Sequence, residues 1–225
     1  MNNEEFVLSS VEKHKTHELI NSKFWPWIEL NFDKPGRIIT MPSRSGRQEN
    51  LILEYIQQLE KKYGRESNLG LYTYDDIYEA EETGINLRHP HRLWRHERCP
   101  DIFKRVLNRW YREGVVAAWF DLTGGLLNRR LLDIQECIAK TFDHGSLMFI
   151  TLAVDNARGL TKNHYARLVY DQCEELQGKV DATDSMLIKT IEQLGNKYIV
   201  PCSAPYVYKH GRATFGVFGY IVGKL

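Results

Sequence analysis

The sequence lacks a long apolar run, a closely spaced cysteine pair and an excess of charge of either sign. No stretch approaches the roughly 20 apolar residues that a membrane helix needs, and the N-terminal residues MNNEEFVLSSVEKHKTHEL are too polar for a signal peptide. The four cysteines contain no CxxC pair, which argues against a zinc site and favours the reduced thiols of an intracellular protein. The formal net charge of +1 gives no global attraction to nucleic acid or to an anionic membrane. We therefore expect a cytoplasmic protein without a membrane partner.

The composition is that of a globular protein. The 225 residues are 43% hydrophobic and 26% charged, which is enough for one full-sized core. We expect an N-terminal arm over residues 1–35 and an α/β domain over residues 36–225. Residues 1–23 of the arm are predicted to be helical or partly disordered. The aromatic run at 24–28 (FWPWI) either packs the arm onto the domain or belongs to a substrate or partner surface.

Residues 115–159 hold the clearest pattern. The apolar run at 115–120 (VVAAWF) predicts a strand buried on both faces of a parallel sheet, and Asp121 follows where that strand should end. Residues 126–142 place apolar side chains at helical spacing, and residues 146–154 (SLMFITLAV) predict a second strand before the polar cluster at 155–159. Ligands of open α/β sheets bind beyond the carboxyl ends of the strands, so Asp121 and the 155–159 cluster are expected at one edge. The alternative role of Asp121 is to cap the helix that begins near residue 126.

The order strand, loop, helix also occurs earlier in the chain. Residues 37–41 predict a strand, residues 42–47 (PSRSGR) a loop, and residues 48–62 an amphipathic helix. The N-terminus of such a helix offers free N–H groups to an anionic ligand, although the loop is neither GxGxxG nor GxxxxGK[ST]. Residues 69–74 predict a second strand, which ends at Asp75 and Asp76. A carboxylate at that place accepts hydrogen bonds from both hydroxyls of a ribose, or it caps the turn at 77–82.

Residues 86–100 (NLRHPHRLWRHERCP) are the most basic stretch of the chain. Its arginines can bind phosphate groups, and Trp94 can stack on a base. The alternatives are a solvated basic loop and, because three histidines lie close together, a metal site. We expect no metal site, since H-x-H with one further histidine and Glu97 matches the known ligand sets poorly.

The remaining segments complete an α/β pattern. Helices are predicted at 101–112, 161–177 and 183–194, and strands at 198–202, 206–209 and 215–222. The last two strands are joined through residues 210–212 (HGR), which predicts a hairpin. The expected fold class is therefore α/β, with a doubly wound, mostly parallel, Rossmann-like sheet that ends in an antiparallel hairpin.

Such a sheet with a C-terminal antiparallel hairpin resembles the fold of class I S-adenosylmethionine-dependent methyltransferases. The resemblance spans residues 36–224 and rests on the order of the elements. It implies S-adenosylmethionine as the cofactor and Asp121 as a catalytic base or acceptor-orienting group. The cofactor-binding residues that it implies are Thr40, Pro42, Ser43, Gly46, Asp75, Asp76 and Asp121. The substrate-binding residues that we infer are Arg88, Arg92, Trp94, Arg95, Gly124 and Arg158.

The chain departs from this family at two motifs. The acidic first motif with its glycine pair is replaced by MPSRSGRQE, and the tetrapeptide of amino-methylating members, an Asp or Asn followed by Pro-Pro and an aromatic, is replaced by DLTG at 121–124. These departures point to a divergent branch, such as one of viral or mobile-element origin, or to a pseudoenzyme. Two functions follow: a methyltransferase that acts on nucleic acid held by residues 88–98, or an inactive scaffold of the same fold that binds nucleic acid or protein.

Overall fold

A computed structural model describes residues 3–40, 47–75, 93–98, 115–121, 138, 142–154, 175–194, 197–210 and 213–224. The described elements, in chain order, are α1 (Asn3–Leu30), β1 (Gly36–Thr40), α2 (Arg47–Tyr63), β2 (Leu69–Asp75), β3 (Leu93–Arg98), β4 (Val115–Asp121), β5 (Leu147–Ala153), α6 (Leu176–Leu194), β6 (Lys197–Pro201), β7 (Tyr206–His210) and β8 (Ala213–Lys224).

The strands form one sheet in the order β3-β2-β1-β4-β5-β8-β6, with β7 also paired to β8. The five strands from β3 to β5 in this order are parallel, and β8 is antiparallel to β5. The predicted α/β class, with a mostly parallel sheet and an antiparallel C-terminal hairpin, is therefore confirmed. The predicted hairpin is β7 and β8, which pair from Tyr206 opposite Val217 to His210 opposite Ala213.

The strand at 198–202 was predicted, but its place in the sheet was not. It is β6, which pairs with the second half of β8, from Lys197 opposite Lys224 to Pro201 opposite Tyr220. The backbone N–H of Cys202 continues this ladder by donating to the carbonyl oxygen of Gly219 at 2.9 Å. β6 and β7 therefore follow each other along the same edge of β8, as one interrupted strand, and the outermost position of the sheet, next to β8, belongs to both.

Two further elements differ from the sequence-based expectation. Residues 93–98, expected within a basic loop or a ligand-binding segment, form the edge strand β3; an edge strand tolerates the charged sequence LWRHER because it faces water along one side. The predicted break between helices at 178–182 is absent, since α6 runs unbroken from Leu176 to Leu194. Buried side chains at Val180, Thr183, Leu187 and Ile191 continue one apolar stripe through that region.

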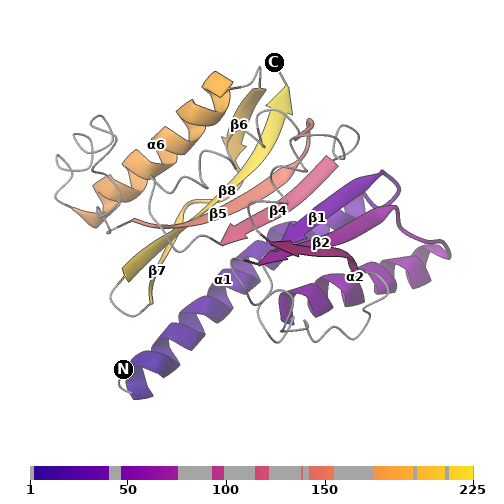
Figure 1. Ribbon diagram of the computed structural model, residues 1–225, viewed down its shortest axis with the longest axis horizontal. Coiled ribbons are helices and arrows are strands. Elements are labelled where there is room, and N and C mark those ends of the chain that lie inside the picture. Colours follow the sequence, from indigo (N-terminus) through magenta and orange to yellow (C-terminus); the bar gives the residue numbers. More distant parts are fainter. Residues whose placement is uncertain are drawn as a thin grey trace.

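Two hydrophobic clusters cover the two faces of the sheet. α1 and α2 pack on one face, where Phe24 and Ile52 belong to one buried cluster with Ala117 and Phe149 of the strands. α6 packs on the other face, together with Ile138 and Phe142 from the connection between β4 and β5. Figure 1 shows α6 on one side of the sheet and α1 with α2 on the opposite side. The connections that follow β1 and β4 therefore lie on opposite faces, and the strand order reverses between these two neighbours.

The aromatic run at 24–28 lies inside α1, which extends seven residues beyond the helix predicted at 1–23 and continues through Pro26. Phe24 and Ile28 have 0% exposed surface, and the Trp27 indole N–H donates to the backbone oxygen of Gly145 at 2.8 Å. Burial of these side chains outweighs the loss of one helical hydrogen bond at proline. The packing interpretation of this run is thus the one that the contacts support. The division of the chain at residue 35 stays a proposal.

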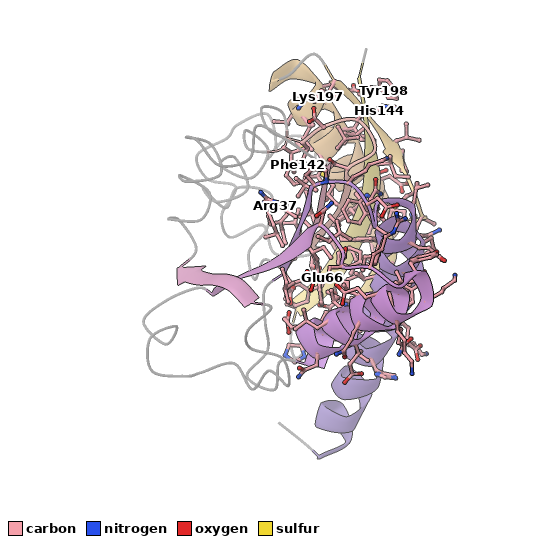
Figure 2. All side chains as sticks on the ribbon, turned by 90° about the vertical axis from the view of Figure 1, so that its right-hand side faces the viewer. Arg37, Glu66, Phe142, His144, Lys197 and Tyr198 are labelled. Carbon is pink, nitrogen blue, oxygen red and sulfur yellow. The ribbon has the colours of Figure 1, made fainter. Side chains whose placement is uncertain are left out.

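The amino edge of the parallel strands is closed by contacts between distant segments. Gly145 has a φ of 84° in the turn before β5, a conformation that favours glycine. The Lys197 ammonium donates to the backbone oxygen of Phe142. Figure 2 shows Phe142, His144, Lys197 and Tyr198 gathered at this end of the molecule. These contacts therefore hold the amino end of β5 to α1 and to β6.

Candidate functional site

The carboxyl ends of β1 and β4 meet where the strand order reverses. β1 ends at Thr40 and β4 ends at Asp121, which pairs in register with Thr151 of β5. In open α/β sheets this reversal opens a crevice between neighbouring connections, and ligands bind there. The prediction that Asp121 lies at the carboxyl edge is confirmed by its position as the last residue of β4.

A buried polar pair lies at the end of β1. The Thr40 hydroxyl donates to Glu49 Oε1 at 2.7 Å, and both residues have 0% exposed surface. Glu49 is in the first turn of α2, where the helix dipole favours a negative charge. Thr40 therefore lies at the carboxyl end of β1, where its hydroxyl is bonded to Glu49; its role in binding a cofactor stays a prediction.

Burial raises the pKa of the Glu49 carboxyl, and the hydrogen bonds from Thr40 and from the residue's own N–H oppose this shift. Oε2 of the same carboxyl is fully buried and has no hydrogen-bond partner in the described part of the chain. A buried carboxylate oxygen without a donor is costly. Glu49 is thus the least satisfied acidic group that the described residues place at this edge.

A second polar network joins both helices of this face to β4 and β5. The indole N–H of Trp119 donates to the Thr151 hydroxyl at 3.0 Å, and the His17 ring stands edge-on to Trp119 with 4.9 Å between the ring centroids. His17 Nδ1 lies 3.0 Å from Gln48 Oε1, and the Gln48 amide N–H donates to Asn21 Oδ1. Residues of α1 therefore form part of the wall of the carboxyl edge.

Asp121 follows Trp119 by two residues on the same strand. Side chains alternate between the two faces of a strand, so Asp121 and Trp119 share the face covered by α1 and α2. Asp121 is only half-buried. Its side chain is therefore more exposed than that of Glu49, the other acidic side chain described at this edge.

The other predicted site residues divide into two groups. The backbone of Asp75 ends β2, and Trp94 and Arg95 lie within β3, where Arg95 pairs with Tyr72 and Arg98 pairs with Asp75. Because β3 is parallel to β2, the two strands end at the same edge as Thr40 and Asp121. The predicted residues outside the described part of the chain are Pro42, Ser43, Gly46, Asp76, Arg88, Arg92, Gly124 and Arg158.

The sequence patterns did not indicate Glu49, His17 or the Trp119–Thr151 pair. The sequence signal for Glu49 was its position in the first turn of the helix after the first strand. The helix dipole by itself favours an acidic residue there, so this position did not point to a ligand site. His17 had no signal, because only the packing of α1 brings it to the sheet. Trp119 and Thr151 are typical core positions of their strands, and only the register of β4 with β5 makes them neighbours.

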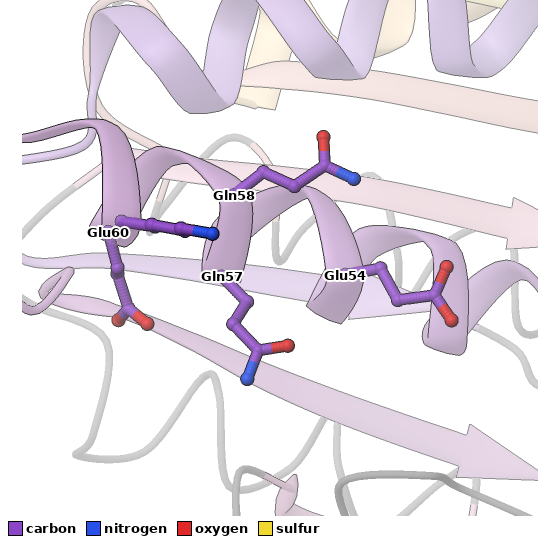
Figure 3. Close-up of a pocket in the computed structure, with 5 residues that line it drawn as sticks. Glu54, Gln57, Gln58 and Glu60 are labelled. Atoms are coloured by element: carbon purple, nitrogen blue, oxygen red, sulfur yellow. The ribbon is translucent and has the colours of Figure 1, made fainter.

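A shallow depression on α2 lies away from this edge. It is lined by Glu54, Gln57, Gln58, Glu60 and Lys61 (Figure 3). All five belong to one helix, so the depression is a feature of the helix surface and brings no separate elements together. Among the described residues, no three His, Cys, Asp or Glu side chains are grouped to hold a metal ion. No helix in the described ranges is both long and apolar enough to cross a membrane.

The chain resembles solved methyltransferase structures at low sequence identity. No protein-family model and no curated protein matches it. It is similar to the O-methyltransferase from Bacillus cereus in complex with SAH, at 10% identity and a TM-score of 0.49, over 98% of this chain and 91% of that chain. It is similar to the N-methyltransferase NodS from Bradyrhizobium japonicum, at 7% identity and a TM-score of 0.49, over 95% and 97% of the two chains.

A third similar structure is a 16S rRNA adenine methyltransferase from Catenulisporales acidiphilia, at 10% identity and a TM-score of 0.42, over 90% of this chain and 91% of that chain. These similarities concern the fold alone. The strand order and directions establish the fold class without these comparisons: the protein has an α/β fold with a mostly parallel sheet that ends in antiparallel strands.

Proposed function

We propose that the protein is an S-adenosylmethionine-dependent methyltransferase whose cofactor binds at the carboxyl edge, between the connections that follow β1 and β4. The observation that supports this most is the reversal of strand order at Thr40 and Asp121, with two carboxylates and a buried threonine gathered around it. At the amino end of β5, the described residues make the structural contacts Trp27–Gly145 and Lys197–Phe142 instead.

The residues of this edge fit a cationic, hydroxyl-rich ligand. When bound, S-adenosylmethionine supplies a methyl group on a positively charged sulfur. Glu49 and Asp121 are acceptors at the ends of β1 and β4, and Glu49 has one oxygen for which the described residues supply no donor. Asp75 or Asp76 would accept the ribose hydroxyls from the end of β2. Thr40, Pro42, Ser43 and Gly46 would line the turn after β1.

Asp121 is the residue that we assign to catalysis. Transfer of a methyl group from a sulfonium needs alignment of the acceptor and, for a protonated acceptor, removal of a proton. A half-buried carboxylate at the end of β4 can hold an O–H or N–H of the acceptor and take its proton. Gly124 would let the acceptor approach the backbone after β4.

Nucleic acid is the acceptor class that we propose. The basic segment at 88–98 supports it: its last residues form β3, which ends at the same edge as β1 and β4. Arg88, Arg92, Trp94 and Arg95, together with Arg158, would hold the phosphates and stack on a base. Binding of a single-stranded oligonucleotide should weaken steeply with salt, and Arg92→Ala should lower the salt slope by about one. Arg65→Ala is the control, because Arg65 is exposed and pairs with Asp33; equal slopes for both variants would contradict this assignment.

Calorimetric titration with S-adenosylhomocysteine tests the cofactor. We expect micromolar binding by the wild-type protein and a loss of at least about tenfold in Asp75→Ala or Asp76→Ala, since a buried hydrogen bond to a charged group contributes about 1.5–3 kcal/mol. Folded wild-type protein that binds neither S-adenosylhomocysteine nor S-adenosylmethionine would overturn the proposal and favour the inactive scaffold.

A further inference from the structure

Three rings of the C-terminal hairpin, Tyr206, Tyr208 and Phe215, form an aromatic stack. The centroids of the Tyr206 and Tyr208 rings are 6.3 Å apart with 23° between the ring planes, and those of Tyr208 and Phe215 are 5.5 Å apart with 21°. Tyr208, in the middle, is only 5% exposed, whereas Tyr206 and Phe215 are half-buried. The aromatic stack therefore has a partly accessible ring at each end.

The strand register places the aromatic stack beside the carboxyl edge of the parallel strands. One row of paired residues crosses the sheet from β4 to β7 and consists of Asp121, Thr151, Val217 and Tyr206. Phe215 pairs with both Ala153 and Tyr208, two residues further toward the carboxyl end of β5. With about 4.8 Å between strands and about 3.3 Å per residue, the backbone of Phe215 lies about 12 Å from that of Asp121.

Packing under α1 explains only part of the aromatic stack. Tyr208 belongs to the buried cluster on the α1 face, Tyr206 and Phe215 pack against that cluster, and α1 contacts β7. This packing accounts for the buried ring of Tyr208. It does not require rings at Tyr206 and Phe215, because aliphatic side chains would cover the same cluster. Partly accessible rings this close to a candidate site point to a ligand with planar groups.

The charges beside the aromatic stack favour an anionic ligand. Lys209 and His210 are exposed at the end of β7, and neither β7 nor β8 contains an acidic residue. Planar rings next to positive charge suit the bases and phosphates of a nucleic acid. A second copy of the same surface would instead bring like charges together.

The carboxyl edge carries basic sequence at its other end as well. β3, with the sequence LWRHER, lies five strand positions from β8, which corresponds to about 24 Å at about 4.8 Å per strand. Thr40 and Asp121 end the strands that lie between them. A single strand of nucleic acid laid along this edge would pass from β3, over the reversal of strand order, to the aromatic stack.

We propose that Tyr206 and Phe215 stack on bases of a single-stranded nucleic acid that lies along the carboxyl edge, next to the nucleotide held at Asp121. This assignment rests on the proposed function, since it takes nucleic acid as the methyl acceptor. Stacking needs only the face of a base, so these rings would hold the strand with little preference for its sequence. The buried Tyr208 ring fixes the two outer rings in orientation.

Binding of two labelled strands, followed by fluorescence anisotropy, tests the stacking. One is a deoxythymidine strand of about 12 nucleotides, and the other has the same length and charge but abasic residues in place of the bases. We expect the wild type to bind the base-bearing strand about 5- to 100-fold more tightly. Phe215→Leu should weaken binding of that strand alone by a similar factor, whereas Phe215→Tyr, which keeps a ring, should retain the preference.

The control is Tyr198→Leu, which removes a half-buried tyrosine of β6 near the amino edge and should change neither affinity. Equal binding of both strands by the wild type would overturn the stacking proposal. So would an unchanged preference in Phe215→Leu, or an equal loss for both strands in that variant.

Photocrosslinking of the wild type decides the point even if Phe215→Leu does not fold. A strand that carries 5-iodouracil should crosslink to Tyr206 or Phe215, and crosslinks confined to other peptides would overturn the proposal. Calorimetry with S-adenosylhomocysteine separates the two proposals. If the protein binds S-adenosylhomocysteine but neither strand, the cofactor proposal stands and the stacking proposal is wrong. Base-dependent binding of the strand without binding of S-adenosylhomocysteine would support the stacking surface and overturn the enzyme.

Discussion

The hydrogen bond between Trp119 and Thr151 shows how single residues stabilise the carboxyl edge of the sheet. The indole N–H is buried between β4 and β5, and its acceptor is the Thr151 hydroxyl at 3.0 Å. Because Thr151 has 0% exposed surface, water cannot replace that hydroxyl. The pair therefore fixes the orientation of the tryptophan against which His17 packs.

Replacement of Thr151 by valine keeps the shape and removes the acceptor. We expect Thr151→Val to lower the free energy of unfolding by about 1–3 kcal/mol, since it leaves a buried donor unsatisfied. Thr151→Ser, which keeps the hydroxyl, should cost less. Urea unfolding followed by tryptophan fluorescence measures both. Equal losses for valine and serine would show that the methyl group, not the hydrogen bond, matters.

Glu49 should make stability depend on pH. Its folded-state pKa is raised above the ordinary value of 4.5, so the folded protein holds the proton more tightly than the unfolded chain does. Between these two pKa values the unfolding free energy falls as pH rises, and below 4.5 the penalty is absent. The melting temperature should therefore fall less between about pH 5 and about pH 7.5 in Glu49→Gln than in the wild type. Glu54→Gln is the matched control, and a fall as large as that of the wild type in Glu49→Gln would contradict this account.

The sequence predicted only part of the site at this scale. Asp121 and Thr40 could be placed because each ends an apolar strand, and strand ends of a parallel sheet share an edge. The partners of Glu49 and of Trp119 could not be placed, because a hydrogen bond between α2 and β1, or between β4 and β5, depends on helix orientation and strand register. Neither helix orientation nor strand register can be predicted from the local sequence pattern.

At the scale of elements, α1 shows a limit of prediction from local sequence. The run FWPWI suggested packing, and the buried Phe24, Trp27 and Ile28 bear this out. α1 contacts α2, β5 and β7. The helix is thus part of the core of its sheet face, although its sequence gives only a weak amphipathic pattern around Pro26.

Shortening one buried side chain of α1 tests this contribution. Phe24 has 0% exposed surface and its ring lies 6.0 Å from that of Phe149, centroid to centroid. Phe24→Ala should lower the unfolding free energy by about 3–5 kcal/mol. Leu30→Ala on the same helix should change it by less than about 0.5 kcal/mol, because Leu30 is 76% exposed. Chemical denaturation distinguishes the two, and a small effect at Phe24 would show that α1 is not part of the folded core.

β8 relies on close approach at a glycine. A Cβ atom at Gly219 would clash with the Phe149 ring and stand 3.0 Å from Cys202 Sγ. Gly219→Ala should therefore cost about 1–3 kcal/mol through overpacking. Ile221→Ala, two residues further along the strand at a side chain that is 44% exposed, should cost less than about 1 kcal/mol. Thermal unfolding of both variants checks this, and equal melting temperatures would contradict the close contact.

Strands that are buried on both faces were the elements easiest to predict. Apolar runs located β4 and β5 to within a residue or two, because a short, β-branched and aromatic run between polar breaks is typical of a buried strand. β3 was missed because its sequence is charged, and an edge strand gains its stability from pairing with β2 more than from its own residues. The helices predicted at 161–177 and 183–194 left a break at 178–182, but α6 is continuous there, and buried side chains from Val180 to Ile191 lie along it.

At the scale of the whole molecule, the sheet could be predicted from the sequence, whereas the candidate site depends on how the elements pack together. The pattern of elements was sufficient to expect a doubly wound sheet with an antiparallel end, and the strand order confirms it. A ligand site at this reversal requires that α2, which follows β1, and the segment of Ile138 and Phe142, which follows β4, pack on opposite faces of the sheet. That arrangement brings together α1, α2, β1, β4 and β5 from widely separated parts of the chain.

Hydrogen–deuterium exchange with saturating S-adenosylhomocysteine tests the location of the site most directly. We expect slower exchange in peptides that span Thr40 to Glu49 and in those that include Asp121, with no change in peptides that cover the amino edge at Gly145 and Lys197. Ligand-free protein measured in parallel gives the reference. Protection confined to the amino edge, or to the helix surface at Glu54 to Lys61, would contradict the claim that the ligand binds where the strand order reverses.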